Sequence, residues 1–170
     1  EWRERGRAEP DRLEDGPADI ESLAKLESLD LVMNESIRLV TPVQWAMRQT
    51  VRDTELLGHY LPKGTNVIAY PGMNHRLEEF YPDPMKFDPL RFTEPRNEHK
   101  QHRYAVSPFG GGAHKCIGMA FGQFEVKTIL HRLRRKYRLE LPHSGYTTEW
   151  DYGGMPVPKD GMHIVLRPLR

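Results

Sequence analysis

The residue best suited to chemistry in this sequence is its single thiol, Cys116. It lies in the stretch SPFGGGAHKCIGMAFGQFE (residues 107–125), where glycines occupy 110–112 and His114 comes two residues before the cysteine. The spacing of apolar residues predicts a helix from about Ile117 to Tyr137, directly after the thiol. A cysteine at a helix N-terminus meets the positive end of the helix dipole and unpaired N–H groups, and both favour the thiolate.

The glycines around Cys116 indicate that a flat group approaches this loop. Glycines 110–112 can adopt backbone angles that other residues avoid, and they leave the loop without side-chain walls. Gly118, predicted to lie inside the first turn of the helix, would cost about 1 kcal/mol relative to alanine, and close approach of a bound group would compensate for that cost. A thiolate in such a loop is the environment that the axial ligand of a haem iron requires.

Two other interpretations of Cys116 remain open from the residues alone. Free cysteine most often behaves as a small buried apolar residue. Alternatively, Cys116 could join histidines in a tetrahedral zinc site, because imidazole and thiolate both suit that metal. The set for this zinc site would be His99, His102, His114 and Cys116. Their spacing fits zinc motifs only loosely, and the glycines would have no purpose there.

The composition limits what else the chain can be. Its 25 basic and 24 acidic residues give a net charge of +1, so no global field favours nucleic acid. One cysteine excludes an internal disulfide framework. The sequence holds no apolar run of about 18 residues and no signal peptide, so no membrane span is predicted within it. With 38% hydrophobic residues, 14 glycines and 14 prolines, the core is lean. We therefore expect a missing N-terminal portion, a partner or a cofactor to complete it.

The elements that must position Cys116 follow from sequence patterns. Residues 1–18 are charged and are predicted to be a helix end and linker, followed by a main region over 19–170 that begins with Asp19 as a helix N-cap. This main region is predicted to contain a helix over 29–40, a β region over 45–73 with a Pro-Lys-Gly turn, a long meander loop over 74–108, the Cys loop over 109–118, a long helix over 117–137 and C-terminal strands over 139–170.

The stretch FGGGAHKCIG (residues 109–118) resembles the haem-binding signature of the cytochrome P450 monooxygenases, Phe-x-x-Gly-x-Arg-x-Cys-x-Gly. His114 takes the place of the usual arginine. Other motifs follow in the family's order from about Ile20 to the C-terminus. Glu35 and Arg38 match Glu-x-x-Arg, FDPLRF resembles the Pro-Glu-Arg-Phe box with Leu90 in place of the acidic residue, and LPKGTNV resembles a turn below the substrate cavity.

The resemblance implies a mainly α fold with small β-sheets (α+β), namely the C-terminal part of the cytochrome P450 fold, which is incomplete alone. It implies haem b (heme, iron protoporphyrin IX) as cofactor, with the Cys116 thiolate as its axial iron ligand and catalytic residue. The helix that lies over the other haem face would precede Glu1. The residues expected to contact the cofactor are Arg48, Phe109, Gly110, Gly112, His114, Cys116, Ile117, Gly118 and Gly122.

The same resemblance implies roles for the charged residues and the partners. Glu35, Arg38 and Arg91 would form a structural charge cluster that braces the loop, while Arg48 and His114 would anchor the haem propionates. The expected activity is insertion of one oxygen atom from O2 into a lipophilic substrate of sterol, fatty or terpenoid type. The walls of the substrate site would be the apolar segments 41–47 and 152–158. Electrons would come from a ferredoxin or flavin reductase, and the protein would be cytoplasmic and bacterial rather than membrane-anchored.

Several assignments stay open at this point. Glu35 and Arg38 could form an ordinary surface pair, although their apolar neighbours favour burial. The basic run HRLRRKYR (residues 131–138) could stabilise a helix C-terminus or dock an acidic electron donor. His75 and His59 are expected to be loop hydrogen-bonding residues. The alternative functions are a haem-binding sensor or carrier without turnover and a zinc-stabilised binding module.

Overall fold

The structure is a computed structural model that describes residues 19–169. The segment 1–18, for which the sequence predicts a helix end and linker, lies outside these residues. The helices are α2 (Ile20–Ala24), α3 (Glu27–Leu39), α4 (Pro71–Asn74) and α5 (Met119–Lys136), with 3₁₀ helices η2 (Pro89–Phe92), η3 (Glu98–Lys100) and η4 (Gly112–His114). The strands are β1 (Ala46–Gln49), β2 (Thr54–Leu56), β3 (His59–Leu61), β4 (Asn66–Ala69), β5 (Tyr137–Glu140), β6 (Trp150–Asp151), β7 (Val157–Pro158) and β8 (Val165–Pro168).

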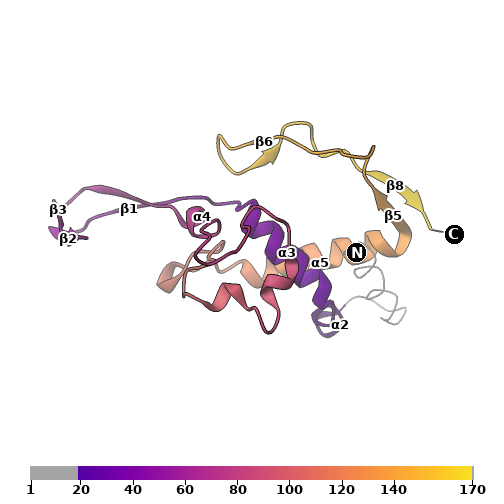
Figure 1. Cartoon of the computed structure of the whole chain (residues 1–170), viewed down its shortest axis with the longest axis horizontal. Coiled ribbons are helices and arrows are strands. Elements are labelled where there is room, and N and C mark those ends of the chain that lie inside the picture. Colours follow the sequence, from indigo (N-terminus) through magenta and orange to yellow (C-terminus); the bar gives the residue numbers. More distant parts are fainter. Residues whose placement is uncertain (1–18, 170) are drawn as a thin grey trace.

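Helices α2, α3 and α5 form the centre of the molecule (Figure 1). Asp19 caps α2, because its carboxylate accepts the Ser22 N–H at 2.8 Å. Three leucines pack against Phe124 and Leu130 of α5, namely Leu23 of α2, Leu26 at the N-cap of α3 and Leu29 of α3. Lys127 of α5 adds a polar contact, since its ammonium group donates to Asp30 of α3 at 2.6 Å.

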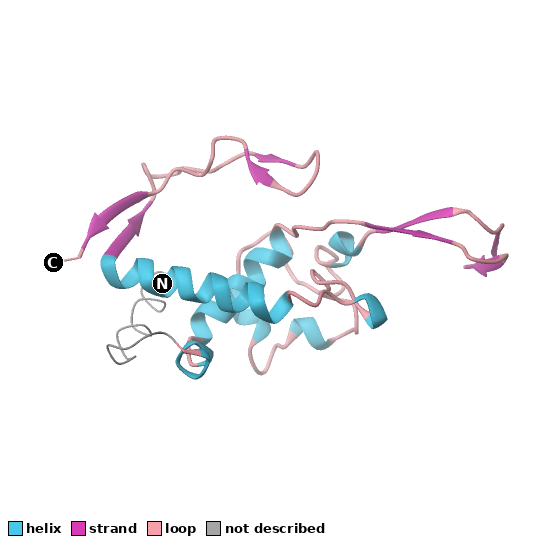
Figure 2. Cartoon of the chain, turned by 180° about the vertical axis from the view of Figure 1, so that it is seen from behind, coloured by secondary structure: helices cyan, strands magenta, loops and turns pink. Residues whose placement is uncertain are grey.

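Among residues 19–169, four two-stranded antiparallel ribbons complete the fold (Figure 2). The β1–β4 ribbon leaves the helices on one side and has the β2–β3 hairpin at its far end (Figure 1). At the other end, β5 continues from α5 and pairs with β8, and the chain between them carries the β6–β7 hairpin back over the helices. The small sheets beside a helical centre confirm the expected mainly α fold with minor β structure.

The β region contains one hairpin that was not expected. The Pro-Lys-Gly turn at 62–64 lies between β3 and β4 as expected, and the Thr65 N–H donates to Pro62 O at 3.2 Å, but each of these strands pairs elsewhere, β3 with β2 and β4 with β1. The tight hairpin turn lies instead at Leu57 and Gly58, which both have positive φ angles of 51° and 80°. Such angles suit a two-residue turn whose twist matches that of the flanking strands.

The interior of the described chain is more polar than apolar. Among residues 19–169, the buried hydrophobic side chains are Leu23, Leu26, Leu29, Met33, Tyr81 and Ala105, whereas the buried polar ones are Glu35, Arg38, Thr41, His75, Arg91, Glu98, Ser107, Lys127 and His131. Hydrogen bonds therefore carry much of the internal connectivity. Within the described part, no helix has the length and apolar character needed to cross a membrane.

Candidate functional site

The Cys loop (residues 109–118) is folded by hydrogen bonds of its own backbone. The Gly110 N–H donates to Ser107 O at 3.0 Å, and the Cys116 N–H donates to Phe109 O at 2.9 Å. Gly110 and Gly112 have positive φ angles of 69° and 66°, a region that residues with a Cβ atom rarely adopt. The loop thus brings Cys116 back beside Phe109 and leaves the thiol exposed.

The thiol is followed in the chain by exposed apolar residues and glycine, and it is preceded by exposed His114 and Lys115. Gly118 lies directly beneath the sulfur, since a Cβ atom there would be 3.8 Å from Cys116 Sγ. Ile117 is fully exposed and Phe121, on the first turn of α5, is 70% exposed. An exposed sulfur beside bare glycine backbone and apolar side chains fits a flat, largely apolar metal-bearing group such as haem.

The long helix begins later than the sequence predicts. Met119 is the first helical residue of α5, Gly118 is its N-cap, and the Gly122 N–H donates to Gly118 O at 2.8 Å. Cys116 therefore lies in the loop before the cap. The expected destabilisation of the helix by Gly118 was wrong, because that cost applies to glycine inside a helix and Gly118 is the N-cap residue.

Two cavities adjoin the Cys loop, and one of them contains Arg48. A cavity of about 360 Å³ is shared by Arg48 of β1, Tyr104, Gly110 and Gly111. A second cavity, of about 320 Å³, is lined by Phe109, the three glycines, Lys115 and Met119. The structure thus brings Arg48 and the glycines of the Cys loop to one cavity, although 62 residues separate Arg48 from Gly110. His114 lies in η4 and is exposed.

A network of buried charges lies behind the Cys loop. Arg38 Nε and Nη2 bond the two carboxylate oxygens of Glu35 at 2.7 and 2.9 Å, in a bidentate arrangement. Arg91 Nε bonds Glu35 Oε1 at 3.1 Å. All three side chains are at most 1% exposed. The alternative of a surface pair for Glu35 and Arg38 therefore does not hold.

The two arginines of this network hold the meander loop by its backbone carbonyls. Arg38 donates to His75 O and Pro84 O, each at 2.6 Å. Arg91 donates to three more carbonyls at 2.9–3.0 Å, those of Pro82, Asp83 and Lys86. Buried carbonyls need partners, and a guanidinium group has enough donors to serve several at once. The network thus fixes a loop that has little regular structure.

One aromatic ring lies against both arginines. The guanidinium carbons of Arg38 and Arg91 are 4.9 and 5.9 Å from the centre of the Tyr81 ring. Tyr81 is fully buried, and this burial raises the pKa of its hydroxyl. The ring's π face attracts the cations and packs the space between the network and the meander loop.

Sequence reasoning missed the second acid of the network, Glu98. Its Oε2 atom accepts from Arg91 Nη1 at 2.7 Å, and its Oε1 atom accepts from Arg96 Nη2 at 2.6 Å. Leu90, which stands where the resembling motif has an acid, is 36% exposed at the surface. Because Glu98 begins η3, a 3₁₀ helix of only three residues within the meander loop, no periodic pattern could have identified it.

His75 was expected to be a loop hydrogen-bonding residue, and the structure gives it a central place. Its ring is fully buried and lies between Thr41, 2.7 Å from Nδ1, and the Ser107 N–H, 2.8 Å from Nε2. Burial, with a smaller contribution from the nearby Arg38 guanidinium, lowers the pKa of His75 to about 4. The ring is therefore neutral at ordinary pH.

The alternative zinc set does not assemble. Within residues 19–169, no three His, Cys, Asp or Glu side chains are grouped so that they could hold a metal ion. His99 packs against Phe92 with ring centres 5.2 Å apart, and His102 stacks on Phe80 at 5.7 Å. These histidines complete the aromatic packing of the meander loop.

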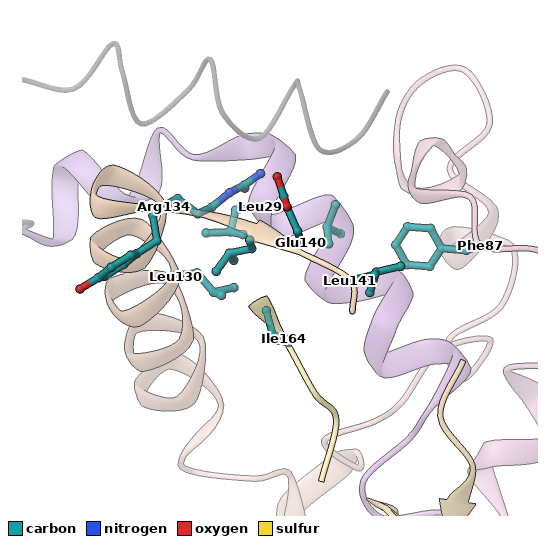
Figure 3. Close-up of a pocket in the computed structure, with 10 residues that line it drawn as sticks. Leu29, Phe87, Leu130, Arg134, Glu140, Leu141 and Ile164 are labelled. Carbon is teal, nitrogen blue, oxygen red and sulfur yellow. The ribbon is translucent and has the colours of Figure 1, made fainter. Parts of the chain in front are cut away.

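A separate apolar cavity lies away from the thiol, between α3, α5 and β5 (Figure 3). Leu29, Leu130 and Ile164 point into it, and its volume is about 320 Å³. Its remaining lining residues are Val32, Phe87, Arg134, Tyr137, Leu139, Glu140 and Leu141. Neither Cys116 nor Arg48 contributes to this cavity, so it is distinct from the candidate site.

Known proteins resemble the chain over nearly its whole length. The family model for cytochrome P450 matches residues 2–160. Cytochrome P450 136 of Mycobacterium tuberculosis is 76% identical over 168 residues, which are 99% of this chain and 34% of that protein. Sterol 14alpha-demethylase of Mycolicibacterium vanbaalenii is 35% identical over 136 residues, or 80% of this chain and 30% of that protein.

A solved structure agrees with these matches. Retinoic acid-bound cyanobacterial CYP120A1 superposes with a TM-score of 0.88 at 34% identity, over 99% of this chain and 39% of that one. The chain spans about a third of the length of the curated relatives it matches. Its fold is that of the corresponding part of these proteins, and haem is the cofactor of their family. The chain therefore belongs to the cytochrome P450 family of haem-dependent monooxygenases.

Proposed function

We propose that this chain is the haem-ligating portion of a monooxygenase in which the Cys116 thiolate is the axial iron ligand. One observation carries the proposal: Cys116 is exposed in a glycine-rich loop, with the Gly118 backbone close to its sulfur and exposed Ile117 next to it in the chain. Haem bound there would supply dioxygen activation, using two electrons from a donor, and insertion of one oxygen atom into the substrate.

The chain's own residues would hold and orient that group. The Cys116 sulfur would donate electron density to the iron, and the Phe109 carbonyl would fix the cysteine backbone through its 2.9 Å hydrogen bond. Arg48, in the cavity beside Gly110 and Gly111, would pair with a propionate, and exposed His114 would donate to the other. Phe109 would shield the thiolate face from water. Gly112, Ile117, Gly118 and Gly122 would allow close approach of the macrocycle.

A lipophilic substrate of sterol, fatty or terpenoid type suits the segments expected to form its walls. Val43, Trp45 and Met47 are each 51–54% exposed, and Met155 and Val157 of the C-terminal hairpin region are 68% and 53% exposed. Apolar side chains gathered on two segments favour an apolar ligand. The matched sterol 14alpha-demethylase and the retinoic acid complex act on or bind lipophilic molecules, which supports the same class here.

The proposed partners are the remainder of a protein as long as the matched relatives, called here the family-length protein, and an electron donor such as a ferredoxin or flavin reductase. Arg132, Lys136 and Arg138, near the end of α5, are exposed and would attract an acidic donor surface. Their place at a helix C-terminus also stabilises α5 by itself. Replacing Arg132 and Lys136 by glutamine should therefore slow reduction of the iron more at low ionic strength than at high ionic strength.

The decisive experiment uses the absorption spectrum of the dithionite-reduced, carbon monoxide-treated family-length protein. We expect a Soret band strongly red-shifted from that of histidine-ligated haem, and we expect Cys116→Ser to abolish it. Ser144→Ala, in an exposed loop remote from the Cys loop, is the control and should leave the band unchanged.

Two results would contradict the proposal. An unchanged band in Cys116→Ser would show that the Cys116 sulfur is not the axial ligand of the iron. A protein that binds haem through Cys116 but consumes no reductant with oxygen and any lipophilic candidate would be a sensor or carrier instead.

A further inference from the structure

The segment that leads into the Cys loop is tied to the end of helix α3 by one side chain, His75. Thr41 lies just beyond α3 and is 2% exposed, and Ser107 lies two residues before Phe109 and is 9% exposed. The fully buried His75 ring bridges them, with Nδ1 2.7 Å from Thr41 Oγ1 and Nε2 2.8 Å from the Ser107 nitrogen. A residue of the meander loop thus connects two segments that are 66 positions apart.

The hydrogen bonds leave only one arrangement of protons on this ring. A backbone N–H can only donate, so Nε2 must present its lone pair to Ser107. The proton of the neutral ring is then on Nδ1, where it donates to Thr41 Oγ1. Thr41 can accept because its own hydroxyl donates to Ile37 O at 3.0 Å. A second ring proton would face the Ser107 N–H, so the arrangement requires a neutral imidazole.

A short path of backbone hydrogen bonds runs from Ser107 to Cys116. Ser107 O accepts the Gly110 N–H at 3.0 Å, which closes the turn 107–110. Phe109, inside that turn, accepts the Cys116 N–H at 2.9 Å. A shift of the Ser107 peptide would therefore move the carbonyl that holds the cysteine.

The neighbouring charge network does not make this connection itself. Within the described residues, the hydrogen bonds of the Glu35, Arg38 and Arg91 side chains end on residues 35–98. His75 joins the network through its carbonyl, which accepts from Arg38 Nη1 at 2.6 Å, and joins the start of the Cys loop through its ring.

We propose that His75 is a positioning residue for Cys116. Its neutral ring, held between Thr41 and the Ser107 peptide, sets where the turn 107–110 lies and thereby where the Cys116 sulfur stands relative to the haem iron. This inference rests on the proposed function, because the position of the sulfur matters to the iron only if Cys116 is its ligand.

Two matched substitutions separate the two ends of the ring. The amide of His75→Gln reaches about as far as Nε2 and can accept the Ser107 N–H through its oxygen. The shorter amide of His75→Asn reaches about as far as Nδ1, keeps a donor for Thr41 and leaves the Ser107 N–H unpaired. Both remove the ring, so a loss of packing alone would affect them in the same direction.

The first measurement is amide hydrogen exchange in the family-length protein, with or without haem. We expect His75→Asn to speed exchange at Ser107 and Cys116 by about tenfold or more, because a buried N–H without a partner favours local opening. His75→Gln should change both by less than about threefold. Equal exchange in the two variants, or unchanged exchange at Cys116 in His75→Asn, would overturn the proposal.

The second measurement is the reduced carbon monoxide spectrum at equal haem content. We expect His75→Asn to lose a larger share of the red-shifted thiolate band than His75→Gln. If wild type shows the full band and both variants lose it equally, this proposal fails and the proposed function stands. If wild type itself shows no such band, it falls together with the proposed function.

Thr41 provides a second pair of variants in case the His75 substitutions do not fold. Thr41→Val leaves the Nδ1–H without an acceptor, whereas Thr41→Ser keeps the hydroxyl. Faster Ser107 exchange in Thr41→Val, with wild-type exchange in Thr41→Ser, is the expected pattern. Wild-type exchange in both would contradict the role given to the ring.

Discussion

The charge network and the Cys loop are connected through His75 but differ in how complete they are. Glu35, Arg38 and Arg91 are at most 1% exposed, and the described chain itself supplies their partners. Cys116 is exposed, and its neighbour Ile117 is entirely uncovered. The supports of the loop are thus internal to this chain, while the surface around the sulfur is left for other groups to cover. Perturbations of the two regions should consequently have different effects.

Breaking the charge network should have the largest effect on stability. In Arg38→Met, the Glu35 carboxylate loses its bidentate partner and the carbonyls of His75 and Pro84 lose their donor. We expect the free energy of unfolding to fall by about 3–5 kcal/mol, since the buried Glu35 carboxylate keeps only Arg91 as a cationic partner and two carbonyls are left without their donor. Denaturant titration of the family-length protein, followed by circular dichroism, measures this loss.

Arg96→Met is the matched control for Arg38→Met. Arg96 also pairs with two carboxylates, those of Asp88 and Glu98, but its side chain is 37% exposed. We expect a loss of about 1 kcal/mol or less for this more exposed ion pair. Similar losses in the two variants would mean that burial does not set the strength of the network.

Acid should weaken the protein through His75. Its pKa is lowered from 6.5 to about 4 in the folded protein, so between those values the unfolded chain binds a proton that the folded chain does not. Stability therefore falls as pH decreases from about 6.5 to about 4, by roughly 3 kcal/mol in total, and His75 adds no further slope below that range.

Comparing wild type with His75→Gln isolates this contribution from that of the other histidines. The free energy of unfolding, measured at pH values from 7 to 4, should fall less steeply in the variant. Parallel curves for the two proteins would show that His75 is not kept neutral by the fold.

A methyl group inside the Cys loop should have a smaller effect. In Gly111→Ala the new Cβ would be 2.7 Å from Tyr104 Cε1, so the Tyr104 ring must move. We expect a destabilisation of about 1–3 kcal/mol from this overpacking. The additional substitution Tyr104→Leu, measured by the same denaturation, should recover part of the loss.

Gly112→Ala tests the alternative that backbone angle alone matters in this loop. No atom lies within 4 Å of the position of its Cβ, but its φ angle is 66°. We expect about 1–2 kcal/mol from the left-handed conformation, and no recovery with Tyr104→Leu. Recovery in both variants would rule out the steric explanation for Gly111.

The fold class and the order of the main elements could be predicted because their signals are local. Apolar spacing identified the helices, and the Cys loop signature supplied the position of the thiol. The start of α5 was misplaced by two residues, because Ile117 fits a helical pattern although its side chain is fully exposed. The hairpin at Leu57–Gly58 was missed, because the Pro-Lys-Gly signal nearby is stronger in sequence.

The supporting residues were harder to find because their partners are mostly backbone groups of an irregular loop. Glu98 meets Arg91, and His75 meets the Ser107 N–H, across stretches that have no periodicity. Such contacts depend on where the loop runs in space. Charge pairing within one helix, as in Glu35 and Arg38, was the only part of the network with a fixed spacing.

The Tyr81 side chain has a consequence for which sequences this architecture accepts. Among the described residues its buried hydroxyl has no hydrogen-bond partner, whereas its ring lies against both arginines. The aromatic face thus makes the stabilising contacts, whereas the hydroxyl oxygen gains no hydrogen bond in the folded protein that it would not also have with water in the unfolded chain. Phenylalanine should therefore be accepted at this position, because it keeps the ring and removes the unpaired hydroxyl. Leucine would be too small to fill the space and would leave two cations facing a surface that does not attract them.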